Sequence, residues 1–159
     1  SGDEPMSKRG KPYLKKSFES SGASSDTSAN IYCSMINSAA WLDLTASQKV
    51  LYVTCKAQYY AEKKKPIQDD NTTFTMNKSK WSEKYQLYTA NNQRGFQRDI
   101  SALISHGFIS CVKSGATTRS KSIYRFSDKW QHFNESIFEI LPNEMNATLI
   151  HELKKLEEK

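Results

Sequence analysis

The fold of this chain is decided between residues 77 and 126, where the sequence reads NKSKWSEKYQLYTANNQRGFQRDISALISHGFISCVKSGATTRSKSIYRF. The order of its patterns predicts a short helix, a turn, a second helix over about Asn91–Gly107, and two strands around a basic loop. Apolar residues of the second helix recur at i, i+4, i+7 and i+8, the spacing of one helical face. These residues are Phe96, Ile100, Leu103 and Ile104.

The opposite face of the second helix has a different character. At about 100° per residue, it collects polar and basic side chains and no apolar ones. They are Asn91, Arg94, Arg98, Ser101 and Ser105. Side chains of these types bond to phosphates and to the base edges in DNA grooves. We therefore expect a mainly α fold with a small β-hairpin wing, a winged helix-turn-helix that presents this helix to DNA.

The first helix of the pair is expected to begin at Asn77, a residue type that caps helices well. Trp81 and Tyr85 stand at i and i+4, so both are expected to point inward. Three lysines lie on the outer side, where the first helix of a helix-turn-helix crosses the DNA backbone. They are Lys78, Lys80 and Lys84. The turn follows over Gln86 to Ala90.

The two ends of the second helix are marked differently. Thr89, Asn91 and Asn92 are all able to cap its first turn, and the sequence does not choose among them. Gly95 weakens this turn by up to about 1 kcal/mol, which leaves the helix start open. Gly107 suits the left-handed position that follows a helix.

A basic hairpin is expected after the second helix. Phe108–Lys113 and Ser122–Phe126 are rich in β-branched and aromatic residues, which predicts two strands with Gly115 in the turn between them. No acidic residue occurs between Asp99 and Asp128, whereas three basic residues lie in and beside the loop: Lys113, Arg119 and Lys121. A basic hairpin beside a basic helix is the arrangement of a wing. An ordinary exposed hairpin is the alternative.

The segment before this region predicts two further helices and a strand. Helical spacing indicates a helix over about residues 31–42, with Ile31, Met35, Ala39 and Leu42 on its apolar face. Thr45-Ala46-Ser47-Gln48 is a capping-box sequence that opens a helix to about Lys63, before Pro66. The strongest stripe of that helix is Val50, Leu51, Thr54, Ala57, Gln58 and Ala61. Phe74 to Met76 predicts the strand.

Residues 1–30 are expected to form a flexible arm that is basic and then Ser-rich. Apolar residues that would compensate for the entropy of ordering are few there. Its basic residues are Lys8, Arg9, Lys11, Lys15 and Lys16. The arm either lies along a DNA backbone or minor groove or is a solvated tail. We expect Met6 to be the native start and Ser1–Pro5 to be left over from cloning.

The remaining chain divides into a DNA-binding domain over residues 31–127 and a C-terminal helical extension over residues 128–159. Apolar residues in the extension are expected to pack back on the domain: Trp130, Phe133, Ile137, Phe138, Ile140 and Leu141. Leu149, Leu153 and Leu156 then stand at helical spacing. This last helix either docks on its own domain or mediates dimerisation, for which two heptads are a weak signal.

Composition narrows the function classes. The chain has 159 residues and a formal net charge of +6, which favours a polyanionic partner such as nucleic acid. Cys33, Cys55 and Cys111 have no metal-binding spacing, so we expect reduced thiols in a cytoplasmic protein without metal or cofactor. We expect no membrane span and no secretory signal, because long apolar runs are absent. Neither a catalytic triad nor a phosphate-cradling glycine loop occurs, which argues against an enzyme.

Three stretches resemble a known family. Ser38-Ala39-Ala40-Trp41-x-x-Leu44, followed by a helix with Val50 and Tyr52, is similar to winged-helix proteins of phages, conjugative plasmids and related mobile elements. The run Leu103–Ile109 and the start Met6–Pro12 are similar to them too.

The resemblance covers roughly residues 7–126. It implies a winged-helix fold and a role in replication or plasmid transfer, because such proteins include replication initiators and small accessory or regulatory proteins of transfer. Gly95 departs from the Thr or Ser that relatives often have nearby.

We therefore expect sequence-specific binding of double-stranded DNA. Arg94 and Arg98 are the candidates for guanine or neighbouring phosphates, and Asn91 or Asn92 for adenine. Lysines of the first helix and basic residues of the wing are expected to hold phosphates and set register. The full expected set is Asn91, Asn92, Gln93, Arg94, Gln97, Arg98, Ser101, Lys78, Lys80, Lys84, Lys113, Arg119 and Lys121.

Two alternatives remain open. One is the DNA-binding domain of a plasmid or phage replication initiator, and the other is a winged helix used for protein–protein contact. The expected partners besides DNA are a second copy of the chain or proteins of replication and transfer.

Overall fold

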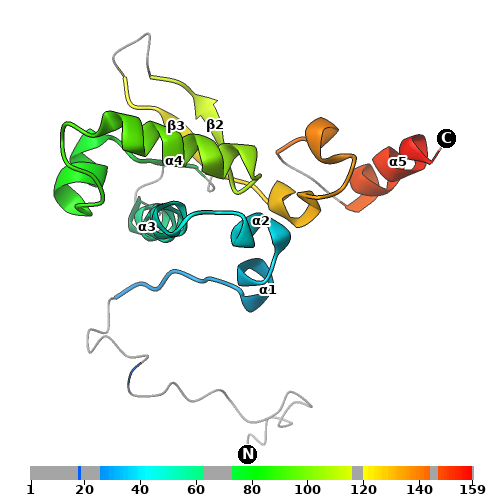
Figure 1. Ribbon diagram of the computed structural model, residues 1–159, viewed down its shortest axis with the longest axis horizontal. Helices are drawn as coiled ribbons and strands as arrows, with labels where there is room; N and C mark the ends of the chain where they lie inside the picture. The colour runs from blue at the N-terminus through cyan, green and yellow to red at the C-terminus, as the bar shows by residue number, and fades with distance from the viewer. Residues whose placement is uncertain (1–17, 19–25, 63–72, 116–119, 144–146, 159) are drawn as a thin grey trace, which may run out of the picture.

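The computed structural model describes residues 18, 26–62, 73–115, 120–143 and 147–158. It is a mixed α/β structure with one small sheet, and α4 lies between α3 and the β2–β3 hairpin in Figure 1. The elements are α1 Cys33–Ile36, α2 Ala39–Leu42, α3 Ala46–Glu62, β1 Thr73–Thr75, η2 Ser79–Lys84, α4 Gln93–Ser105, β2 Ile109–Lys113, β3 Ile123–Phe126, η3 Lys129–His132, η4 Phe138–Ile140 and α5 Ala147–Glu157.

The three strands form one antiparallel sheet in the order β1-β3-β2. Tyr124 of the central strand pairs with Phe74 of β1 on one side and with Cys111 of β2 on the other. The predicted hairpin is confirmed as the β2–β3 pair, and its register is irregular between Cys111 and Lys113. Such an irregularity bends a strand and increases its twist. The sequence did not predict that β1 pairs with the hairpin.

The core lies where α3 and α4 meet the sheet. Trp41, Tyr52 and Phe108 form edge-to-face contacts with centroid distances of 5.6, 5.8 and 5.3 Å. At the other end of α4, Trp81 stacks on Phe96 at 5.2 Å. Well-placed aromatic pairs contribute about 0.5–1.5 kcal/mol each beyond the area they bury. Aromatic contacts at both ends therefore hold α4 in place.

The single helix predicted over residues 31–42 is wrong, because the chain forms α1 and α2 with a break at Ser38. Ser38 Oγ accepts a hydrogen bond from the Trp41 amide at 3.2 Å and so caps α2. The break changes which residues face the core. Leu42 is 67% exposed, whereas Leu44 is only 5% exposed.

The capping box at the start of α3 is confirmed. The Thr45 amide donates to Gln48 Oε1 at 2.9 Å, and the Gln48 amide donates to Thr45 Oγ1 at 3.4 Å. The stripe predicted for this helix is partly wrong, since Val50 is 50% exposed. The residues buried on α3 are Gln48, Leu51, Tyr52, Cys55 and Gln58. The aromatic ring of Tyr52 buries more apolar area than Val50 could, which favours this rotation of the helix.

Asn92 is the N-cap of α4, chosen from the three candidates. Its Oδ1 accepts the Gly95 amide at 3.0 Å. A Cβ at Gly95 would lie 2.6 to 3.0 Å from the Asn92 amide group. Glycine therefore leaves room for the cap, which accounts for a residue that intrinsic helix propensity disfavours.

The C-terminal end of α4 has the glycine-terminated geometry that the sequence predicted. Gly107 has φ +84°, its amide donates to Ile104 O at 3.1 Å, and the Phe108 amide donates to Leu103 O at 3.0 Å. The predicted inward face is confirmed for Phe96, Ile100 and Leu103. It is wrong for Ile104, whose side chain is 37% exposed.

The helix expected after Asn77 is η2, wound with an i→i+5 hydrogen bond from the Tyr85 amide to Lys80 O at 2.8 Å. Trp81 is buried and Tyr85 is half-buried, as predicted. The predicted cap is wrong in detail, because Asn77 Oδ1 accepts from Ser79 Oγ rather than from a backbone amide.

The C-terminal extension packs beside the end of α4. Phe133 stacks on His106 with a centroid distance of 4.8 Å. The predicted last helix is confirmed as α5, and Lys154 Nζ lies 3.6 Å from Glu135 Oε2. The buried apolar residues of the extension are Ile137, Phe138 and Leu141, whereas Ile140 is 62% exposed.

Leu44→Ala should lower the free energy of unfolding by about 2–5 kcal/mol, because it removes a side chain from the core. Leu42→Ala is the matched control and should change it by less than about 0.5 kcal/mol, since that side chain is exposed. Urea unfolding of both variants measures the difference. Equal losses would contradict the break at Ser38.

Gly95→Ala should not stabilise the protein, although helix propensity alone predicts a gain of about 1 kcal/mol. The added Cβ displaces the Asn92 amide, and losing such a cap costs about 1 kcal/mol. In an Asn92→Ala background, the same substitution should stabilise by about 1 kcal/mol. Thermal unfolding of the wild type, the two single variants and the double variant completes a double-mutant cycle. An equal effect of Gly95→Ala in both backgrounds would contradict the coupling between Gly95 and the Asn92 cap.

Candidate nucleic-acid interface

Residues of α4, η2 and the β2–β3 hairpin line one groove of about 380 Å³. Its floor includes the buried side chains of Trp81, Phe96 and Ile100. Five residues predicted to bind DNA stand along it: Lys78, Gln93, Gln97, Ser101 and Lys121. The fold thus brings the second helix of the predicted pair and the predicted wing to one surface.

The outer surface of α4 is polar and exposes no acidic side chain. Its exposed polar residues are Gln93, Arg94, Gln97, Arg98, Ser101 and Ser105. Asp99 is the single acid of this helix and has no exposed surface. At about 100° per residue, Gln97 lies toward the groove, Arg98 lies on the opposite flank, and Arg94 lies between them.

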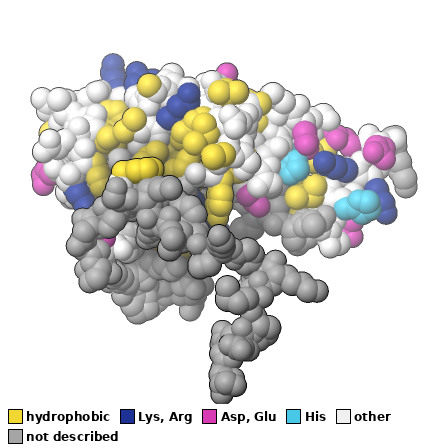
Figure 2. All heavy atoms as spheres, turned by 90° about the horizontal axis from the view of Figure 1, so that it is seen from below, with side chains coloured by type: hydrophobic (Ala, Val, Ile, Leu, Met, Phe, Trp, Pro, Cys, Tyr) yellow, Lys and Arg dark blue, Asp and Glu magenta, His cyan; other side chains and the backbone are white. Residues whose placement is uncertain are grey.

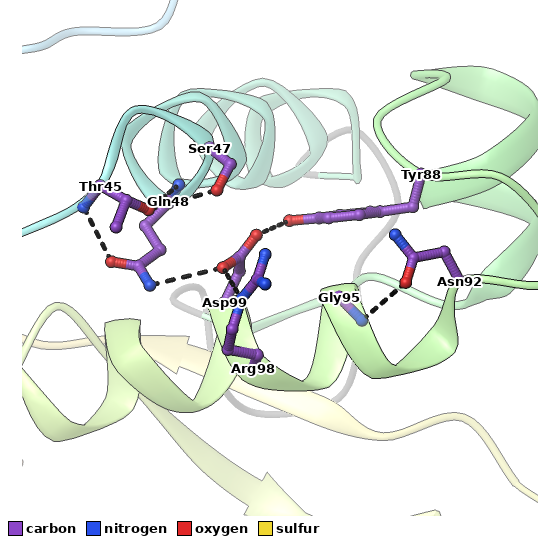
Figure 3. A network of polar contacts seen from close by, with 8 residues as sticks. All are labelled: Thr45, Ser47, Gln48, Tyr88, Asn92, Gly95, Arg98 and Asp99. Atoms are coloured by element: carbon purple, nitrogen blue, oxygen red, sulfur yellow. Dashed lines mark hydrogen bonds and ion pairs between the residues drawn. The ribbon is translucent and has the colours of Figure 1, made fainter.

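Asp99 is held in a network that joins α4 to α3 and to the turn before α4 (Figure 3). Tyr88 Oη donates to its Oδ2 at 2.6 Å, and Gln48 Nε2 donates to its Oδ1 at 3.4 Å. Arg98 Nε donates to the same Oδ1 at 3.0 Å. A buried carboxylate requires such donors, because an unmatched buried charge is strongly destabilising.

The network keeps Asp99 ionised. Burial by itself would raise the pKa of Asp99, but hydrogen bonds from Arg98 and Tyr88 outweigh burial and hold the pKa below its usual range. Burial and the bond to Asp99 together raise the pKa of Tyr88 well above its ordinary value. At neutral pH the phenol is therefore the proton donor and the carboxylate the acceptor.

The two predicted arginines of α4 have different surroundings. Arg94 is exposed on the outer surface. Arg98 turns toward Asp99 and α3, although 69% of its side chain is exposed (Figure 3). Asn92 uses its amide oxygen to cap α4, and Asn91 is exposed in the preceding turn. Arg94 is thus the arginine that stands outward from the helix.

Two of the three lysines predicted on the first helix have partners within the protein. Lys80 Nζ donates to the carbonyl and the hydroxyl of Thr75 in β1. Lys84 Nζ donates to Gln58 Oε1 of α3 at 3.0 Å. Lys78 is exposed and stands at the groove. Lys80 and Lys84 therefore attach η2 to its neighbours, and Lys78 faces solvent at the candidate interface.

The hairpin contributes Lys113 at the end of β2 and Lys121 just before β3, both exposed. Arg119 and the basic residues of the predicted arm lie outside the described residues. The described part of the hairpin thus places positive charge on both of its arms.

The side of the molecule formed by α1, α2 and α3 has a different surface. Figure 2 shows hydrophobic side chains gathered there, with scattered Lys and Arg side chains. The exposed apolar residues on or beside these helices are Tyr32, Ile36, Leu42, Val50 and Val53. Among the described residues, these three helices carry two basic side chains, fewer than α4 and the hairpin together.

The sequence did not predict the Asp99 network or the apolar contribution of Ile104 to the groove. One signal for Asp99 was available, because Phe96, Asp99, Ile100 and Leu103 stand at i, i+3, i+4 and i+7. An acid inside an apolar stripe indicates a buried carboxylate that needs donors. Its donor Gln48 is 51 residues away, so no local pattern identifies it.

Two features of other protein classes, a metal site and a membrane-spanning helix, are absent from the described residues. Their His, Cys, Asp and Glu side chains form no group of three that could hold a metal ion. Among the helices of the described ranges, none combines the length and apolarity needed to cross a bilayer.

Comparison with protein-family models, with curated proteins and with solved structures gave no match for this chain.

Acidification should reduce the stability difference between the wild-type protein and Asp99→Asn. The folded-state pKa of Asp99 lies below its unfolded value, so the ionised carboxylate stabilises the fold above about pH 4. This contribution is lost as the pH falls through the folded-state pKa. Urea unfolding of both proteins between about pH 6 and about pH 2.5 tests this, and a constant difference would contradict it.

Proposed function

We propose that this protein binds double-stranded DNA in a sequence-specific manner through a winged helix-turn-helix. In this proposal η2 and α4 are the helix pair, and the β2–β3 hairpin is the wing. The order helix, strand, two helices and two strands, with β1 beside the hairpin, supports this reading. The groove that α4 shares with the hairpin supports it further.

One observation carries the proposal. Apart from Ile104 at the groove, the exposed residues of α4 are polar or basic, and the single acid of the helix is buried and matched by internal donors. Exposed lysines flank that surface: Lys78 just before η2, and Lys113 and Lys121 on the hairpin. A helix that presents an acidic or an apolar surface to its ligand would not combine these properties. A helix that binds phosphates needs a polar and basic surface without exposed acids.

The proposed contacts follow from the position of each side chain. A helix about 10–12 Å across fits the major groove, which is about 12 Å wide. Arg94 would contact guanine, and Gln93 and Gln97 would contact adenine. Lys78, Lys113 and Lys121 would hold phosphates and set register.

The proposed biological role is that of an accessory or regulatory protein of a conjugative plasmid or other mobile element. This part rests on the similarity of residues 38–44 and 103–109 to such proteins. A replication initiator would use the same interface at a replication origin. Selection of binding sites from random duplexes identifies the target and separates these two roles.

Arg94→Ala should weaken binding to the selected duplex by about 1–3 kcal/mol and relax specificity at one base pair. Lys121→Ala should weaken binding to selected and scrambled duplexes alike, because a phosphate contact carries no sequence information. Lys155→Ala, an exposed lysine on α5, is the matched control and should leave binding unchanged. Fluorescence anisotropy titrations measure all three.

A salt titration tests the proposal as a whole. Each phosphate contact contributes about −0.9 to the slope of log K against log salt concentration. A slope near zero for the wild-type protein would overturn DNA binding. A weak but salt-dependent interaction without sequence preference would leave only non-specific binding.

A further inference from the structure

Arg98 is an exposed residue of α4 that has one donor committed to a buried carboxylate. Its Nε donates to Asp99 Oδ1 at 3.0 Å, while 69% of the side chain remains exposed. A guanidinium has five N–H donors in a planar fork. The bond through Nε leaves the two terminal amino groups for a second partner.

Asp99 is a rigid support for this guanidinium. Its carboxylate is fully buried and accepts from Tyr88 Oη at 2.6 Å and from Gln48 Nε2 at 3.4 Å. Gln48 is fixed in turn by its own bond to the Thr45 amide at 2.9 Å. The anchor therefore belongs to the α3–α4 junction rather than to a flexible surface side chain.

The direction of the Arg98 side chain separates it from the base-reading surface. Arg98 lies about 100° around the helix from Gln97, which stands at the groove. Figure 3 shows its guanidinium drawn back beside Asp99 toward α3. A group on the flank of a helix that enters the major groove faces the sugar-phosphate backbone at the groove edge rather than the base edges.

We infer that Arg98 is a phosphate contact whose guanidinium is positioned by Asp99, and that it does not read a base. This inference rests on the proposed function and assigns to Asp99 a positioning role in DNA binding. The two terminal amino groups would bond a phosphate bidentately, which is the geometry that arginine forms best.

A double-mutant cycle tests the inference in the full chain. The variants are Arg98→Ala, Asp99→Asn, and both together, with Arg94→Ala as the control arginine of the same helix. Binding to a selected duplex and to a scrambled duplex of the same length is measured over a range of salt concentrations. Thermal unfolding of each variant shows which ones fold.

Arg98→Ala should weaken both duplexes by the same factor, roughly ten-fold, and reduce the salt slope by about 0.9. Asp99→Asn should weaken binding when Arg98 is present and have no further effect when Arg98 is absent. Arg94→Ala should instead weaken the selected duplex more than the scrambled one.

Three results would overturn the inference. Arg98→Ala could affect the selected duplex alone, which would make Arg98 a base reader. Asp99→Asn could tighten binding, which would mean that the carboxylate withholds Arg98 from DNA. The effects of the two substitutions could also be additive, in which case Asp99 does not act through Arg98.

Two further measurements keep the test valid if Asp99→Asn fails to fold. Arg98→Lys keeps the charge but lacks the planar fork, so it should weaken binding while retaining most of the salt slope. In the protein without DNA, the Arg98 Nε–H resonance should exchange slowly with water in NMR spectra. Slow exchange without duplex binding would refute the proposed function alone, whereas duplex binding with fast exchange would refute the positioning role alone.

Discussion

The buried carboxylate of Asp99 links the interior of this protein to its candidate binding surface. A carboxylate without exposed surface is tolerated only where donors surround it, and its donors come from α3, from the turn before α4 and from α4 itself. The contact that docks α4 on α3 therefore also holds the guanidinium of Arg98 beside Asp99. Packing and surface chemistry depend on the same atoms.

The start of α4 also depends on a few side chains that act together. Asn92 caps the helix because Gly95 has no Cβ, and Trp81 stacks on Phe96 one residue further along. These contacts fix where α4 begins and how its first turns pack against η2. The lysines of η2 also take part in internal contacts, since Lys80 is bonded to β1 and Lys84 to α3. The number of basic residues in a segment thus overstates the charge offered to a polyanion.

Much of the fold was predictable because its signals are local. The capping box, the glycine after α4 and the hairpin each depend on a few neighbouring residues, and each is confirmed. The wrong predictions came from apolar periodicity in two situations. In one, a local hydrogen bond interrupts the periodic helix, and in the other, a larger neighbouring side chain takes the buried position. Ser38 broke the helix predicted over residues 31–42, and the ring of Tyr52 displaced Val50 from the core. Apolar spacing alone does not show which side chain the packed core will bury.

By itself, the sequence determined the order of the elements from α3 to β3, the polar and basic face of α4, and the absence of acid from Ile100 to Ser127. These follow from spacing and composition, which act over a few residues. Only the tertiary structure decided that Arg98 pairs with a buried acid, that two lysines of η2 bond to β1 and α3, and that Ile104 faces the groove. These outcomes depend on how α3, β1 and the hairpin pack around η2 and α4. Gln48, for example, donates to Asp99 from 51 residues away, and no local pattern specifies that partner.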